Sequence, residues 1–187
     1  MKRVIFSAVM LLLIRSAYAQ HVEYGIKGGV NFANIKDDAA DNDADGKTGF
    51  HLGGLAHIHI TRAFAIQPEI VYSTQGAEYG NAKLRLNYIN VPVLAQYMFA
   101  DGFRLQTGPQ LGILTTSEWK NGNTETDVDN LSNADFSWSF GASYVGRSGL
   151  GVDARYNLGL TDVSKSNTTD LQNRVWQLGL FYQFRRK

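Results

Sequence analysis

The 187-residue sequence has no cysteine, only three prolines and few charged residues. Without cysteine, neither a disulfide framework nor a thiolate metal site can hold the fold together. Charged residues make up 19% of the chain and the formal net charge is +1, which excludes the strongly basic surface of a nucleic-acid-binding protein. Hydrophobic residues reach 44%, which argues against disorder. The length suits one domain rather than two well-packed ones.

The sequence also lacks an apolar run long enough for a membrane-spanning helix, which needs about 20 residues. Its N-terminal run, residues 4–14, is only eleven residues long; Lys2 and Arg3 precede it, and an Ala-Tyr-Ala pattern ending at Ala19 follows. This arrangement predicts a secretory signal peptide over residues 1–19, cleaved between Ala19 and Gln20. The mature domain, residues 20–187, then carries a net charge of −2.

Beyond residue 20, apolar and polar residues alternate, which is typical of strands with two different faces. In residues 150–160, for example, six apolar side chains alternate with glycine or polar residues. The pattern predicts eight strands: 22–35, 49–60, 64–75, 86–99, 103–115, 135–145, 150–160 and 174–184. Each is about long enough to cross a membrane as a tilted strand.

The predicted connections alternate between short and long. Residues 61–63, 100–102 and 146–149 form short turns, whereas 36–48, 76–85, 116–134 and 161–173 form long polar loops. This is the outer-membrane pattern of periplasmic turns and extracellular loops. The predicted fold is therefore all-β: an eight-stranded, antiparallel, up-and-down transmembrane β-barrel in the cell outer membrane, reached after export to the periplasm.

Volume decides which face of the strands points outward. An eight-stranded barrel has an interior only just wide enough for its side chains, and the apolar face, rich in aromatic residues, would not fit there. The other face carries many glycines and fits. A soluble barrel with the faces reversed is the alternative.

Four segments resemble a known family, the PorT-like outer-membrane β-barrel proteins of Bacteroidetes, relatives in architecture of the OmpA and OmpX barrels. The segments are 24–32 (YGIKGGVNF), 66–76 (IQPEIVYSTQG), 86–94 (LNYINVPVL) and 108–112 (GPQLG). The resemblance covers nearly the whole mature chain. It implies the barrel fold, and for the named member a part in secretion across the outer membrane.

The three prolines, Pro68, Pro92 and Pro109, fall inside three successive predicted strands. Proline removes a ladder hydrogen bond, and a closed barrel has no edge strand to accommodate it. We expect a bulge or bend shared by these strands; the alternative is a weakened seam that opens or receives a partner.

Six charged residues have inward parity: Glu23, Lys27, Glu69, Arg104, Asp153 and Arg155. Their charges sum to zero, and unpaired charges in a narrow lumen would be costly. We therefore expect a polar network that plugs the lumen. A narrow ion path is the alternative.

The sequence offers only weak candidates for a metal site. His51, His57 and His59 share the inward parity, but His51 lies near the opposite end of its strand. Asp41, Asp43 and Asp45 match the first half of a calcium-binding loop, but position 12 is Leu52 where a bidentate Glu is needed. We expect interior polar packing and an acidic loop, with a millimolar-range cation site as the alternative.

No catalytic constellation and no cofactor motif appear, so the sequence predicts a structural or interaction protein without a cofactor. The four long loops together carry a charge of −6, and Trp119 in the third is the aromatic residue best placed for a partner contact. The expected partners are outer-membrane lipid and, through the loops, another envelope protein. Nucleic acid is not expected, and no small-molecule substrate is indicated. A transporter, a secretion-accessory barrel and a barrel enzyme are the alternatives.

Overall fold

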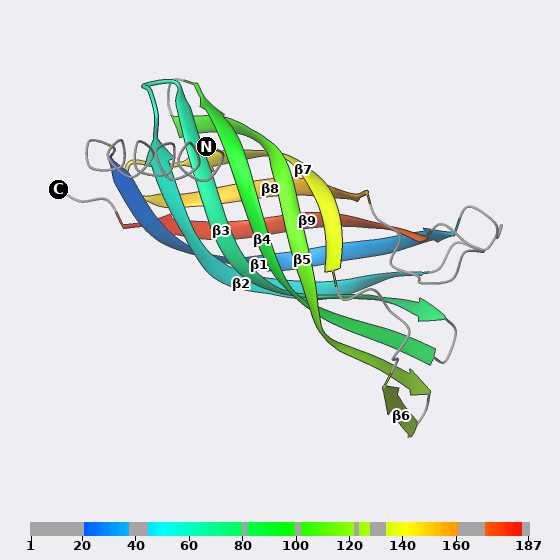
Figure 1. The fold of residues 1–187 in the computed structure, drawn as a ribbon. Helices are drawn as coiled ribbons and strands as arrows, with labels where there is room; N and C mark the ends of the chain where they lie inside the picture. The colour runs from blue at the N-terminus through cyan, green and yellow to red at the C-terminus, as the bar shows by residue number, and fades with distance from the viewer. Residues whose placement is uncertain are drawn as a thin grey trace, which may run out of the picture.

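A computed structural model describes residues 21–37, 45–79, 82–99, 102–121, 124–127, 134–160 and 171–184. They form one antiparallel sheet of strands (Figure 1). The strands are β1 (Val22–Asp37), β2 (Asp45–His59), β3 (Phe64–Tyr79), β4 (Ala82–Met98), β5 (Phe103–Asn121), β6 (Thr124–Asp127), β7 (Ala134–Val145), β8 (Leu150–Gly159) and β9 (Leu171–Gln183). The predicted signal peptide and Ala19 lie outside the described residues.

Eight of these strands close into a barrel. Leaving out β6, each strand pairs with the next along the chain, so that β5 pairs with β7, and β9 pairs with β1 to complete the ring. β6 stands apart from the ring because it pairs only with the end of β5. The predicted eight-stranded antiparallel barrel is confirmed.

The strands extend further at the loop end than the alternation predicts. β3 continues to Tyr79 and β4 begins at Ala82, so most of the loop predicted over 76–85 is strand. β5 reaches Asn121 and turns back into β6 within the loop predicted over 116–134. Figure 1 shows β3, β4 and β5 diverging here from the rest of the wall, with β6 beside β5. The strands continue here although the alternation of apolar and polar residues fades, because backbone pairing does not depend on side-chain polarity.

The opposite end of the barrel has tight turns closed by backbone hydrogen bonds. The amides of Ile60, Phe99 and Gly146 donate to the carbonyls of Phe64, Phe103 and Leu150, at 2.8–2.9 Å. Gly149 ends the last turn with a φ of 89°, a left-handed conformation that glycine adopts without strain. We call this the turn end of the barrel.

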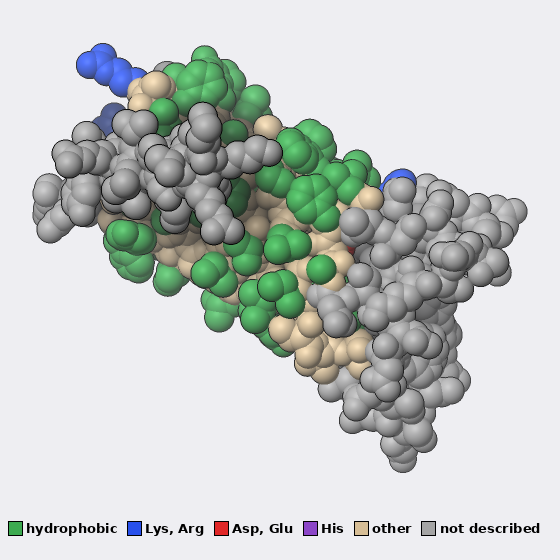
Figure 2. Space-filling view, viewed as in Figure 1, with side chains coloured by type: hydrophobic (Ala, Val, Ile, Leu, Met, Phe, Trp, Pro, Cys, Tyr) green, Lys and Arg blue, Asp and Glu red, His purple; other side chains and the backbone are tan. Residues whose placement is uncertain are grey.

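Large apolar side chains cover the outside of the barrel (Figure 2). Every second residue along the barrel strands points outward, and the large apolar side chains exposed in this way include Tyr24, Ile70, Leu105 and Leu180. Aromatic rings contact one another toward the turn end, including Phe64 with Tyr97 and Tyr182 with Phe184. An apolar outer belt with aromatic residues near its limits is the surface that a bilayer covers. None of the described segments forms a helix of the length and apolarity needed to span a membrane.

The prolines interrupt the strand ladder without shifting it. Pairing between β3 and β4 is lost between Pro68 and Val71 but has the same register on both sides, and a similar gap follows Pro92 between β4 and β5. The bulge expected at the prolines is therefore wrong, whereas the shared bend stays a prediction. The register shifts of this sheet lie between Gly46 and His51 and between Asn87 and Tyr88, nearer the loop end. The prolines remove hydrogen bonds but leave the chain extended, because their fixed φ is compatible with a strand.

Candidate functional site in the barrel lumen

Four charged side chains meet inside the barrel: Lys27, Glu69, Asp153 and Arg155. The Arg155 guanidinium donates to both Glu69 carboxylate oxygens, at 3.0 and 2.8 Å. The Lys27 ammonium lies 3.1 Å from Asp153 and 3.4 Å from Glu69. All four side chains are 0–3% exposed, and their formal charges cancel. We call this group the charge quartet.

The charge quartet joins strands that are not neighbours in the sheet. Lys27 lies on β1, Glu69 on β3, and Asp153 and Arg155 on β8, so the contacts cross the lumen rather than follow the wall. The bidentate Arg155–Glu69 pair is a strong, directional interaction. Gln67 donates a further hydrogen bond of 2.8 Å to Glu69. The lumen is therefore filled at this level by side chains that hold one another in place.

A second group of polar side chains lies on the loop side of the charge quartet. Asn31 donates to the Ser73 hydroxyl at 2.9 Å and contacts the His51 ring nitrogen Nδ1 at 2.8 Å. Gln177 donates to the Asn31 side-chain oxygen at 3.1 Å, and Gln75 donates to the Ser73 hydroxyl at 3.0 Å. Because these bonds connect β1, β2, β3 and β9, they extend the filling of the lumen toward the loops.

Toward the turn end, the lumen also contains apolar side chains that the sequence patterns did not single out. Leu55, Val145 and Phe181 form a buried cluster with exposures of 3–6%. Phe181 fits because its partner across β8 and β9 is Gly151, where a Cβ would collide with the phenyl ring. The alternation in the sequence places all three residues on the lumen-facing side of their strands. Phe181, however, lies in an unbroken apolar run with Leu180 and Tyr182, which hides the alternation.

The remaining two charged residues of the predicted network lie nearer the turn end, apart from the charge quartet. Glu23 is buried, and its carboxylate is 3.4 Å from His21. Arg104 is also buried and donates to Gln183 at 3.0 Å. All six predicted residues thus point into the lumen, but only four of them meet.

The three inward histidines separate into two places. His51 contacts Asn31, whereas His57 and His59 form an edge-to-face pair 4.5 Å apart near the turn end. Among the residues that the structure describes, no group of three or more His, Cys, Asp or Glu side chains is placed to hold a metal ion.

Two of the residues predicted to form loop sites, Asp41 and Asp43, lie outside the described residues. Asp45 begins β2 and pairs with Glu78, and Trp119 lies on β5 between Leu84 of β4 and Thr126 of β6. Trp119 is therefore part of a strand rather than of a loop.

A closed antiparallel barrel with an apolar exterior and a polar interior defines a transmembrane β-barrel. The chain belongs to the family described as outer membrane protein beta-barrel domain, whose model matches residues 18–165. Its location is accordingly the outer membrane.

Solved structures with the same fold include two small bacterial barrels. Neisserial surface protein A (NspA) is 13% identical with a TM-score of 0.64, and covers 88% of this chain and 99% of its own. The attachment invasion locus protein Ail of Yersinia pestis is 17% identical with a TM-score of 0.55. The match covers 87% of this chain and 98% of the Ail chain. At these identities the likeness shows the fold alone. A search of curated protein sequences finds no match.

Proposed function

We propose that this protein is a small outer-membrane barrel with a structural or interaction role, acting through its surfaces while its lumen stays closed. The charge quartet carries this proposal, because its four side chains are almost fully buried and cross the lumen. An ion passing this point would have to break contacts that offset the high cost of burying charge. The apolar cluster of Leu55, Val145 and Phe181 adds a second obstruction at the turn end.

The extended strands at the loop end supply the surface for an interaction. We place the turn end in the periplasm and the loop end outside, following the usual arrangement of outer-membrane barrels. β4, β5 and β6 form a sheet that carries Trp119 on its middle strand. Tryptophan is a residue type enriched where binding energy concentrates, so this sheet is the contact surface proposed for a protein partner.

The loop charge argues against a polyanionic ligand. One structure of Ail contains the heparin analogue sucrose octasulfate. The four predicted loops of the present chain carry −6 in total, which repels such a ligand. The acidic loops favour a partner with a basic or neutral surface.

A narrow pore and a secretion-accessory barrel are the alternative functions. The charged lumen favours the first, and the resemblance of residues 24–32 and 66–76 to PorT-like proteins favours the second. An enzymatic role is not favoured, because we identify no nucleophile with an oriented base in the described part of the chain.

Conductance across a planar bilayer tests whether the lumen is closed. Purified wild-type protein is expected to give no steady channel. The double variant Glu69→Ala/Arg155→Ala removes one cation and one anion, so the lumen stays neutral while the Lys27–Asp153 pair remains. Combined with Phe181→Ala, which removes the largest side chain of the apolar cluster at the turn end, this variant is expected to pass small, steady currents. A stable wild-type channel would instead favour the pore.

The predicted processing site is tested on protein recovered from outer membranes. We infer that the mature chain begins at Gln20, so N-terminal sequencing is expected to start there. A chain that retains residues 1–19 would contradict the signal peptide. Heat-modifiable migration on a denaturing gel shows independently that the barrel has formed.

A further inference from the structure

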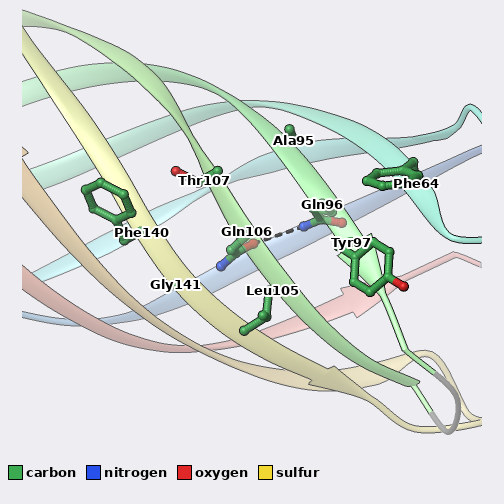
Figure 3. A pocket seen from close by; sticks show the side chains of 9 residues that line it. All are labelled: Phe64, Ala95, Gln96, Tyr97, Leu105, Gln106, Thr107, Phe140 and Gly141. Carbon is green, nitrogen blue, oxygen red and sulfur yellow. Dashed lines mark hydrogen bonds between the residues drawn. The ribbon is translucent and has the colours of Figure 1, made fainter.

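The outer wall of the barrel contains a groove near the turn end, between β3, β4, β5 and β7 (Figure 3). Its volume is about 430 Å³. The lining residues are Phe64, Ala95, Gln96, Tyr97, Leu105, Gln106, Thr107, Phe140 and Gly141. We call it the β4–β5 groove.

The β4–β5 groove exists because two small side chains lie among large ones. Ala95 and Thr107 face each other across the pairing of β4 and β5 and form the floor. Phe64, Leu105 and Phe140 form the walls, with exposed fractions of 53%, 47% and 50%. The difference in side-chain size leaves a depression among bulky residues.

The exposed polar group on the floor of the β4–β5 groove, the Thr107 hydroxyl, is already hydrogen-bonded within the protein. The Thr107 hydroxyl accepts a hydrogen bond of 2.8 Å from the Trp138 indole and donates one of 3.0 Å to the Ser139 carbonyl. Gln96 and Gln106 are buried on the lumen side and hydrogen-bond to each other at 2.9 Å. The groove therefore suits an apolar occupant.

We propose that the β4–β5 groove holds one acyl chain of a bilayer phospholipid. The groove is continuous with the apolar belt, which bilayer acyl chains cover, so such a chain reaches it without leaving its own leaflet. An acyl chain in the groove contacts the floor and the walls, whereas an acyl chain on a flat part of the belt contacts the protein on one side only.

The turn end adds a charge that suits the phospholipid headgroup. Arg62 is exposed in the turn between β2 and β3, two residues before Phe64 of the groove wall. A guanidinium pairs well with a phosphate group. The lipid belongs to the leaflet at the turn end, which the orientation proposed above makes periplasmic.

Photolabelling tests the occupant directly. The full-length mature protein is refolded into phosphatidylcholine vesicles containing a trace of phosphatidylglycerol with a diazirine on one acyl chain, then irradiated and digested. Label is expected to concentrate on residues 95–107 and on Phe140, at least several-fold above Trp176 and Leu178 of β9 on the opposite side of the barrel. Even labelling around the belt would overturn the proposal.

Ala95→Phe fills the groove, and Val30→Phe adds the same side chain to the belt on β1, across the barrel. Ala95→Phe is expected to reduce labelling at the groove about tenfold, because losing contact with two methylene groups corresponds to about one power of ten in affinity. Val30→Phe is expected to leave it unchanged. Equal labelling of both variants would overturn the proposal, and so would a groove-to-groove cross-linked dimer, which would assign the groove to a second copy of the chain.

Two further variants keep the test decisive. If Ala95→Phe shows no heat-modifiable migration and so has not folded, Phe140→Ala removes a wall instead and is expected to reduce labelling as well. Arg62→Gln is expected to lower labelling by phosphatidylglycerol while leaving its position unchanged; unchanged yield would overturn the part of the proposal that concerns the headgroup. These outcomes do not depend on conductance, so failure here and failure of the closed lumen are separate results.

Discussion

Glu69→Ala is expected to lower the free energy of unfolding by about 3–5 kcal/mol, because breaking a buried ion pair leaves an uncompensated charge. Glu69 accepts both hydrogen bonds of Arg155 and also contacts Lys27. Without it, Asp153 alone faces two buried cations. Urea unfolding in vesicles, followed by tryptophan fluorescence, measures the change.

Two variants make this test specific. Glu23→Ala removes a carboxylate at the turn end that lies 3.4 Å from the half-exposed His21 imidazole, and it is expected to cost less than about 1 kcal/mol. Glu69→Ala/Arg155→Ala restores neutrality, so its cost is expected to fall below the sum of the two single costs. Additive single costs, or a loss below about 1 kcal/mol for Glu69→Ala, would show that the charge quartet does not act as a unit.

The second large effect is expected from Gly53→Ala, which should destabilise the barrel by about 3 kcal/mol or more, at the upper end of overpacking costs. A Cβ on Gly53 would collide with the Ile70 carbonyl oxygen and lie 2.8 Å from the Val71 Cα. Both atoms belong to the β3 backbone, which cannot move without breaking its own pairing with β2 and β4. The fraction of heat-modifiable protein after refolding, together with urea unfolding, reports the effect.

Gly54→Ala is the matched control because it places the same methyl group one residue further along β2. Gly54 points outward, and a Cβ there meets only the Gly25 carbonyl oxygen, at 3.8 Å. This variant is expected to refold like the wild type. If both variants refold equally well, close strand approach at Gly53 does not limit the barrel.

The eight strands could be predicted because each crosses the membrane with one apolar and one lumen-facing side. Alternation is strongest where the two environments differ most, as in residues 150–160, where β8 lies. It weakens beyond the belt, because both sides of a strand then face similar surroundings. The continuation of β3 to Tyr79 and the pairing of β5 with β6 could not be inferred for this reason.

The inward parity of the charge quartet could be predicted, but its pairing could not. Glu69 and Arg155 are 86 residues apart and lie on strands that do not touch. Their meeting depends on the register of every strand pair between them and on closure of the ring. Parity assigns a residue to the lumen, whereas position along the lumen requires the whole set of registers.

The pairing of β1 with β9 also constrains how the barrel assembles. These strands contain the first and last paired segments of the described chain, so the ring closes only when the C-terminal strand is in place. Until then β1 and β8 each present an open edge, and unpaired backbone groups are costly in hydrocarbon. Membrane insertion and ring closure are therefore one kinetic event, and its rate is governed by contacts between residues far apart in the sequence.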